Sequence, residues 1–356
     1  MKVAIIAVTE EGARLGEKLR SGLPGERVLY LSSKINNAEI AAEVFNLPLS
    51  HLVGKLIKNF DGIVFIMALG IAVRVIAPYI QSKIQDPAIV VVDEKGRYAI
   101  STLGGHWAGA NELTRQVADI LGAKPVITTA TDIQGLPAID VIARRLHSIP
   151  EPFHAVKDVN MALLRQEKVE IFSEIPREEI KAQWTDPKGQ LIWKDIGDYT
   201  GASKHIAVVL SSRLFPQEMK PTLFLRPRNL VVGLGCRRGV TVDEIKTAVE
   251  ETFRQERLST LSIAAFSTID RKKDESALLQ LAKAWEISVR FWSPAELARV
   301  IEEFPELNWS PRVKEKVGVG GICEPAAILG SGRGSLVVRK RKYQRVTLAV
   351  ARARSL

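Results

Sequence analysis

The chain has 356 residues, of which 46% are hydrophobic and 25% are charged, and its formal net charge is +10. These proportions are ordinary for globular proteins, and the length predicts two or three domains. The positive charge suits an anionic partner, but only 6% of the residues are aromatic and they are not interleaved with the basic ones, so we expect no nucleic-acid partner. The two cysteines lie far apart with no histidines clustered around them, which argues against a disulfide framework or a zinc site.

The N-terminal third alternates strand and helix patterns. Val3–Val8 is a continuous apolar run, which predicts a strand buried on both faces rather than a signal peptide. Residues 62–80 form the most apolar span, but Gly70, Arg74 and Pro78 interrupt it. We therefore expect a strand followed by a helix, no membrane partner and a cytoplasmic protein.

The helix expected after Gly70 is a first candidate binding region. The N–H groups at the start of a helix attract anions, and Arg74 lies in the first turns of this helix. Gly70 and Arg74 are therefore candidate ligand-binding residues. A surface arginine on an apolar helix explains the same pattern equally well.

A strand, a glycine loop, a helix and a second strand are predicted next. Residues 97–102 and 126–130 have strand patterns, and apolar residues between them recur at helical spacing. Ligands of such units bind outside the carboxyl ends of the strands. Two such ends occur here, Gly104-Gly105-His106 after the first strand and Thr131-Asp132 after the second.

The residues at these strand ends suit proton transfer. Glycine lets a backbone approach a ligand closely, and the side chain of His106 titrates near neutral pH. Asp132 and Asn111 could converge on the same point. The alternative is structural: Gly104-Gly105 makes a tight turn, and His106 and Asn111 cap the following helix.

The rest of the chain gives weaker signals. Residues 155–223 are charged and irregular, with short strand patterns that predict a small α+β segment. A strand over 230–235 then runs into a glycine and arginine loop, whose Gly233-x-Gly235 pattern is only a weak dinucleotide signal. Residues 317–327 combine several glycines with Glu324 at a helix start, which makes Glu324 a candidate site residue. The structural alternative is that the glycines allow close packing and that the carboxylate of Glu324 favours the helix dipole.

We therefore predict a multi-domain α/β protein. Its N-terminal domain, 1–132, is expected to contain a mostly parallel sheet flanked by helices. A small α+β middle domain, 133–225, precedes a C-terminal α/β domain, 226–356. Residues 336–351 predict a hairpin at the edge of the last sheet.

Several motifs in this order resemble the CbiG family of cobalamin biosynthesis. Those in the N-terminal half are residues 68–74, residues 86–93, Gly104-Gly105-His106-x-x-Gly109-Ala110-Asn111 and residues 122–132. Those in the C-terminal part are residues 233–237, 267–275 and 318–327, which resemble the related CobE module. The resemblance spans nearly the whole chain and is loosest in the middle segment. It departs from the family pattern at Leu103-Gly104, where a serine is expected before the second glycine.

The resemblance implies a hydrolase of the anaerobic cobalamin pathway, which acts on cobalt-precorrin-5A. Water opens a δ-lactone on ring A of this cobalt-containing tetrapyrrole, acetaldehyde leaves, and cobalt-precorrin-5B remains. The cobalt belongs to the substrate, so we expect no tightly bound cofactor or metal. The expected partner is the cobalt corrinoid, whose carboxylates suit the positive charge of the chain. Binding to other enzymes of the pathway and assembly into a homo-oligomer are further possibilities. The alternative is a carrier that binds the corrinoid without catalysis.

The mechanistic hypothesis assigns the proton transfers to the central loop. His106 is the general base, and Asp132 orients it or replaces it as the base. Backbone N–H groups at Gly104-Gly105, with Asn111, supply donors to the oxyanion. Arg74 and Arg237 pair with carboxylates. The complete substrate-binding set is Gly70, Arg74, Gly104, Gly105, Thr129, Thr131, Gly235, Arg237 and Glu324. Axial ligation of the cobalt by His106 is an alternative role.

Overall fold

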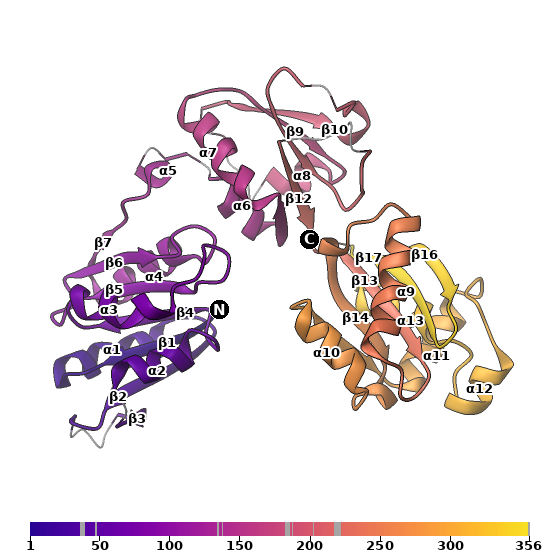
Figure 1. Cartoon of the computed structure of the whole chain (residues 1–356), viewed down its shortest axis with the longest axis horizontal. Coiled ribbons are helices and arrows are strands. Elements are labelled where there is room, and N and C mark those ends of the chain that lie inside the picture. The colour runs from indigo at the N-terminus through magenta and orange to yellow at the C-terminus, as the bar shows by residue number, and fades with distance from the viewer. Residues whose placement is uncertain are drawn as a thin grey trace. The chain divides into compact units, whose positions relative to one another are not determined.

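The computed structural model describes residues 1–35, 40–46, 48–133, 135–136, 138–181, 186, 188–201, 203–216 and 222–354. The chain divides into two compact units, Met1–Val141 and Ile142–Leu356 (Figure 1). Each unit is built on twisted sheets with flanking helices, as expected for an α/β chain. The helices of the described residues include none with both the length and the apolarity needed to cross a membrane.

The first unit contains a seven-stranded sheet in the order β3-β2-β1-β4-β5-β6-β7. The strands are β1 (Lys2–Ala7), β2 (Glu26–Ser32), β3 (Glu43–Phe45), β4 (Gly62–Ile66), β5 (Ala88–Val92), β6 (Tyr98–Leu103) and β7 (Lys124–Val126). All residues of β4 and β5 are buried, which explains their continuous apolar runs. The expected mostly parallel sheet is confirmed, because only the β5–β6 pairing is antiparallel.

Helices cover both faces of this sheet. They are α1 (Glu10–Gly22), α2 (Leu49–Leu56), α3 (Leu69–Ile76) and α4 (Ala110–Leu121). The 3-10 helix η1 (Ala77–Tyr79) follows α3, and α5 (Ala130–Ile133) and α6 (Ile139–Arg145) follow β7; α6 continues into the second unit. Leu19 of α1 and Val117 of α4 belong to the core on one face. Val53 of α2 and Ala72 of α3 belong to the core on the other.

The reversal at β5–β6 decides where the central loop lies. Ile89 at the start of β5 pairs with Leu103 at the end of β6. Because β6 and β7 are parallel to each other, both end at the edge of the sheet where β4 and β5 begin. The second predicted strand, 126–130, is wrong in its position: β7 ends at Val126, and α5 begins at Ala130.

The second unit contains two five-stranded sheets, in the orders β10-β9-β11-β12-β8 and β15-β14-β13-β17-β16. The first comprises β8 (Ser148–Glu151), β9 (Val169–Ser173), β10 (Leu191–Asp195), β11 (Ile206–Leu210) and β12 (Leu223–Pro227), with α7 (Val156–Leu164) and α8 (Arg177–Lys181). Four of its strands are parallel and only β8 is antiparallel, so the middle segment has more regular α/β pairing than its sequence suggests. The predicted domain boundaries stay predictions.

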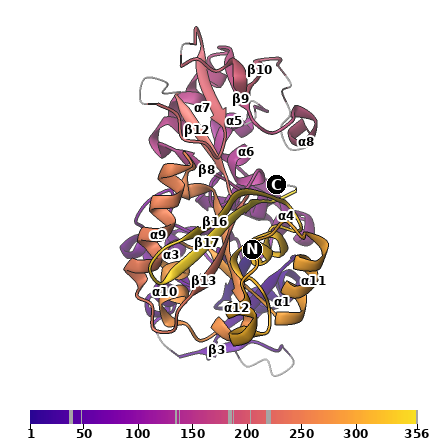
Figure 2. The ribbon, with the colours of Figure 1, turned by 90° about the vertical axis from the view of Figure 1, so that its right-hand side faces the viewer.

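The last sheet comprises β13 (Leu230–Cys236), β14 (Ile263–Ile269), β15 (Ser288–Trp292), β16 (Ser335–Lys342) and β17 (Val346–Arg352). Its helices are α9 (Val242–Gln255), α10 (Ser276–Ala284), α11 (Pro294–Glu303), α12 (Pro311–Val317) and α13 (Cys323–Gly330). The β16–β17 hairpin places β16 at the sheet edge, as predicted (Figure 2). A Cβ atom at Gly233 would collide with the carbonyl oxygen of Cys323, so this glycine allows α13 to pack on β13. The glycine pattern therefore has a packing explanation.

Candidate active site

His106 lies in the loop between β6 and α4 and contacts two carboxylates. Its Nε2 is 2.8 Å from Oδ2 of Asp132, and its Nδ1 is 3.3 Å from Oδ1 of Asp140. The Thr131 hydroxyl is 3.2 Å from Nε2. Only 10% of the His106 side chain is exposed. The imidazole is thus held at both ring nitrogens in a nearly dry setting.

Asp132 is the most strongly held member of this cluster. Besides its contact with His106, its Oδ2 accepts a hydrogen bond of 2.8 Å from Nδ2 of Asn111. Its Oδ1 pairs with the guanidinium of Arg115 on α4. Arg115 also lies 3.8 Å from Glu112, one turn earlier on the same helix. The carboxylate is therefore fixed by three separate donors.

Asn111 is buried and supports this arrangement. Its Oδ1 accepts a hydrogen bond from Ser101 on β6 at 2.7 Å. Its Nδ2 donates to Thr129 at 3.0 Å as well as to Asp132. Because both amide hydrogens are used within the chain, the contacts do not support the predicted role of Asn111 as an oxyanion donor. They assign it to the positioning of Asp132.

The structure explains why glycine occupies several positions of the loop. Gly104 has a φ of 71°, which favours glycine. A Cβ at Gly105 would lie 2.9 Å from Oδ1 of Asn111. Gly109 caps α4 with a φ of 89°. These glycines bring the loop close to Asn111, and the predicted role of the Gly104 and Gly105 N–H groups stays a prediction.

The two ends of the His106–Asp132 contact have opposite pKa shifts. Burial alone would lower the pKa of His106, but contacts with Asp132 and Asp140 outweigh it and raise the pKa to about 9. Burial alone would raise the pKa of Asp132, but His106 and Arg115 lower it to about 2. At neutral pH the cluster therefore contains an imidazolium and an ionised Asp132. A protonated imidazole is a proton donor, which argues against the predicted general-base role of His106 in the resting protein.

The structure brings together most of the predicted residues of the central loop. His106, Asp132, Asn111, Thr129 and Thr131 form one hydrogen-bonded cluster. Thr131 is buried, so its hydroxyl serves His106 rather than an open ligand site.

Sequence reasoning missed two charged members, Asp140 and Arg115. The signal for Arg115 was available: it lies four residues after Asn111 on the same helix, where side chains share a face. Asp140 gave no comparable signal.

Gly70 and Arg74 are not part of this cluster. Gly70 lies in the first turn of α3, which follows the carboxyl end of β4. That end is opposite to the edge where β6 ends. Both residues are exposed, and their predicted contact with substrate stays a prediction.

The candidate residues of the second unit have different surroundings. Arg237 is exposed, next to the end of β13. A Cβ at Gly235 would lie 2.7 Å from Oγ1 of Thr347, so packing explains this glycine. Glu324 is buried. Its carboxylate accepts hydrogen bonds from the Asn308 N–H at 2.7 Å and the Lys340 N–H at 3.0 Å, which gives it a structural role; its predicted contact with substrate stays a prediction.

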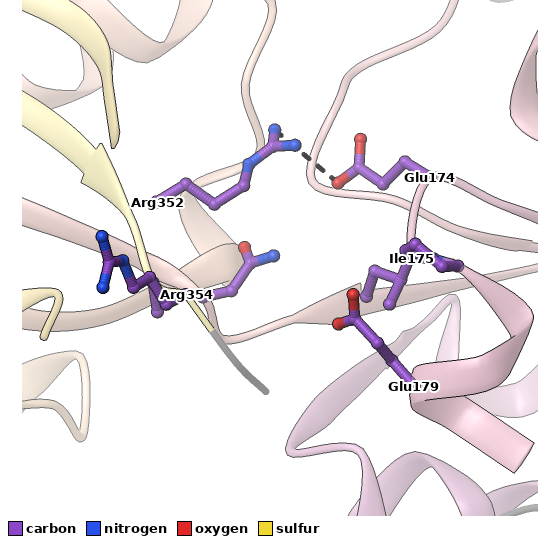
Figure 3. A pocket seen from close by; sticks show the side chains of 8 residues that line it. Glu174, Ile175, Glu179, Arg352 and Arg354 are labelled. Atoms are coloured by element: carbon purple, nitrogen blue, oxygen red, sulfur yellow. Dashed lines mark ion pairs between the residues drawn. The ribbon is translucent and has the colours of Figure 1, made fainter. Parts of the chain in front are cut away.

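A small pocket of about 160 Å³ lies between the two sheets of the second unit (Figure 3). Its lining includes Glu174 and Glu179 from one side and Arg352 and Arg354 from the other. Glu174 is 3.8 Å from Arg352 and accepts hydrogen bonds from the N–H and hydroxyl of Ser212, each at 2.8 Å. These contacts satisfy the buried carboxylate and fasten the two sheets together.

Family models match three consecutive stretches of the chain. The model described as Cobalamin synthesis G N-terminal matches residues 51–132, Cobalamin biosynthesis central region matches 137–227, and Cobalamin synthesis G C-terminus matches 230–351. The matched stretches follow one another in family order across most of the chain.

Two relatives are similar to this chain over nearly its whole length. A cobalt-precorrin-5A hydrolase of Priestia megaterium is 34% identical over 98% of this chain and 94% of that protein. A protein of the same name from Salmonella typhimurium is 32% identical over 98% of this chain and 97% of that protein. Protein CobE of Sinorhizobium sp is 28% identical over 34% of this chain and 79% of that protein. The chain therefore belongs to the CbiG family of cobalamin biosynthesis.

Proposed function

We propose that this protein is a cobalt-precorrin-5A hydrolase, which opens the ring-A lactone of its substrate and releases acetaldehyde to give cobalt-precorrin-5B. The observation that carries the proposal is the 34% identity over 98% of the chain to a relative of that name. The His106 cluster supports it, because lactone opening requires a group that can donate a proton to the departing oxygen.

The first step is hydrolysis of the lactone. A water molecule adds to the carbonyl carbon and gives one proton to the solvent, the ring carbon–oxygen bond breaks, and a carboxyl group and an alcohol form. We assign His106 to donate its proton to the departing alkoxide, since its pKa of about 9 keeps it protonated at neutral pH. Asp132 stays ionised and stabilises the imidazolium.

The second step removes the two-carbon fragment. The alcohol loses its proton, the bond between the fragment and the macrocycle breaks, and acetaldehyde forms. The electron pair of that bond passes into the conjugated macrocycle, so the substrate supplies the electron sink. After the first step His106 is a neutral imidazole with a high affinity for protons, and it accepts the alcohol proton. His106 thus alternates between acid and base.

Arg74 and Arg237 are proposed to pair with carboxylates of the substrate, as both side chains are exposed. The cobalt enters with the substrate, and elemental analysis of the purified protein is expected to find no stoichiometric metal. A cytoplasmic location, a homo-oligomer and contacts with other enzymes of the pathway stay predictions.

The test is the release of acetaldehyde from cobalt-precorrin-5A by the purified protein. We expect catalytic release by the wild type and a loss of at least 100-fold for His106→Ala, a magnitude typical of general acid–base groups, ~10²–10⁴-fold. His51→Ala is the matched control, because His51 is exposed on α2. Stoichiometric binding of the corrinoid without release would instead favour a carrier. Equal rates for both variants would remove His106 from the mechanism.

A further inference from the structure

Helix α3 is apolar around most of its circumference but is buried along only one side. Ala72 and Ile76, one turn apart, pack into the core of the first unit. Leu69, Ile71 and Val73 on the same helix are each more than 40% exposed. A helix that is apolar on all sides is normally covered. The exposed side of α3 therefore lacks the expected cover within the described residues of its unit.

The apolar surface continues beyond the helix. Ile80 and Ile84, in the segment that leads to β5, are 45% and 52% exposed. Of fourteen large apolar side chains exposed in the described residues, these five lie within one stretch of sixteen positions, 69–84. Single exposed apolar residues are common, whereas a concentration of them marks an interaction site. We call Leu69, Ile71, Val73, Ile80 and Ile84 the α3 surface.

The charges within residues 68–85, the stretch that carries the α3 surface, all have one sign. Residues 68–85 contain no Asp or Glu, and their two charged side chains, Arg74 and Lys83, are exposed. Asp86, which follows, is buried and accepts a hydrogen bond from the Gln81 N–H at 2.8 Å. The surface is thus apolar with a cationic border. It is complementary to a ligand with an apolar body and carboxylates around it.

The end of this stretch lies beside the loop that carries His106. Pro87 lies three residues after Ile84, and its carbonyl oxygen is 3.0 Å from the position of a Cβ atom on Gly104. Leu103 pairs with Ile89, so the start of β5 and the end of β6 are neighbours. The stretch from Leu69 to Ile84 therefore runs from the carboxyl end of β4 towards the proposed proton donor.

We propose that the α3 surface binds the apolar face of the cobalt corrin macrocycle, while Arg74 and Lys83 pair with its acetate and propionate carboxylates. The inference rests on the proposed function, which supplies a large, flat ligand with a border of carboxylates. The apolar side chains match the body of that ligand, the two cations match its border, and the neighbouring Gly104 leads to His106. An interface with a second copy of the chain is the competing occupant.

Binding of cobyrinic acid, a stable cobalt corrin with free acetate and propionate side chains, tests the proposal. Its visible absorption gives the dissociation constant for the full-length protein. We expect Val73→Asp and Ile84→Asp to weaken binding at least tenfold, because each places a carboxylate against an apolar ligand with anionic groups. Arg74→Gln is expected to weaken binding severalfold and to reduce its dependence on salt.

Val44→Asp is the matched control. Val44 is 66% exposed on β3, the edge strand of the same sheet, and the substitution is identical. We expect it to bind cobyrinic acid like the wild type. Equal affinity of Val73→Asp and Val44→Asp, or no binding by the wild type, would overturn the proposal. So would a change of oligomeric state in Val73→Asp with corrin binding unaltered, since the surface would then join copies of the chain.

The release of acetaldehyde separates this inference from the proposed function. If the wild type binds the corrin through Val73 but releases no acetaldehyde, the binding site stands and the hydrolase assignment fails. If Val73→Asp releases acetaldehyde with the KM of the wild type, the assignment stands and the binding site fails. The two hypotheses thus have different readouts.

Discussion

Asp140→Asn tests how the protein keeps His106 protonated. The carboxylate of Asp140 lies 3.3 Å from Nδ1 of His106, and the Asp140 side chain is only 13% exposed. Asparagine keeps the size of the side chain and removes its charge. Asp132 remains at Nε2, so the variant isolates the contribution of the second carboxylate.

The expected magnitude follows from the pKa of His106, which the wild type holds at about 9 against an ordinary 6.5. Loss of one nearby opposite charge lowers such a pKa by about one to two units. His106 should therefore titrate at pH about 7–8 in Asp140→Asn. Each unit corresponds to about 1.4 kcal/mol, so the variant should lose about 1–3 kcal/mol of stability at pH 6.

The sign of the pH dependence follows from the raised pKa. A raised histidine pKa stabilises the folded state fully below the ordinary value of 6.5, and this contribution is lost as the pH rises through about 9. The difference in stability between wild type and Asp140→Asn should therefore shrink as the pH rises from about 7 to about 9, and nearly vanish above that range. If His106 acts first as an acid, the rate of acetaldehyde release by the wild type should fall as the pH rises through about 9. In Asp140→Asn the same fall should occur at a lower pH.

Two measurements check this prediction. NMR titration of the five histidines, with His106→Gln to assign the resonance, gives the pKa directly. The pH profile of acetaldehyde release gives its functional counterpart. Asp119→Asn is the control, because Asp119 is an exposed carboxylate near the far end of α4. An unchanged His106 titration in Asp140→Asn would refute the reasoning, as would a rate that rises through pH 9.

Two substitutions in the second unit test structural assignments. Glu324→Ala should lower the free energy of unfolding by about 1–3 kcal/mol, because the partly buried hydrogen bonds from the N–H groups of Asn308 and Lys340 to its carboxylate are lost. Urea unfolding measures this loss, and a raised KM without destabilisation would support a contact of Glu324 with substrate. Gly233→Ala should lower the free energy of unfolding by about 1–3 kcal/mol, because its added methyl group would overpack against Cys323. A variant as stable as the wild type would contradict the packing explanation.

The position of the candidate site was partly readable from the sequence. The pattern of residues 97–132 predicts that two strand ends bring His106 and Asp132 together. The two residues do meet, and β6 and β7 are parallel, but Asp132 lies in α5, six residues beyond the end of β7. The antiparallel turn before β6 was also readable, because residues 93–97 are too few for a crossover between parallel strands. That turn places the loop at the edge opposite to the carboxyl ends of β4 and β5.

The charge state of the site could not be read from the sequence. A histidine near an aspartate suggests a base, whereas Asp132 and Asp140 together raise the pKa of His106 to about 9 and keep the imidazole protonated at neutral pH. Asp140 lies at a helix start, where an acidic residue has an ordinary function beside the helix dipole. Glu324 lies at a similar position, and its partners Asn308 and Lys340 are each sixteen residues away. Equivalent local patterns thus acquire different roles through tertiary contacts.

Gly70 provides the last test, because its surroundings give no structural reason for a glycine. It lies within α3, its φ is not positive, and an added Cβ would meet no atom within 4 Å. Gly104 and Gly233, by contrast, are required by backbone conformation or packing. Glycine within a helix costs up to about 1 kcal/mol relative to alanine. Gly70→Ala should therefore raise the stability of the first unit by up to about 1 kcal/mol and weaken the binding of cobyrinic acid, if the macrocycle approaches the backbone there. Greater stability with unchanged corrin affinity would show that the ligand does not reach the start of α3, and would confine the binding surface to its later turns and to Ile80 and Ile84.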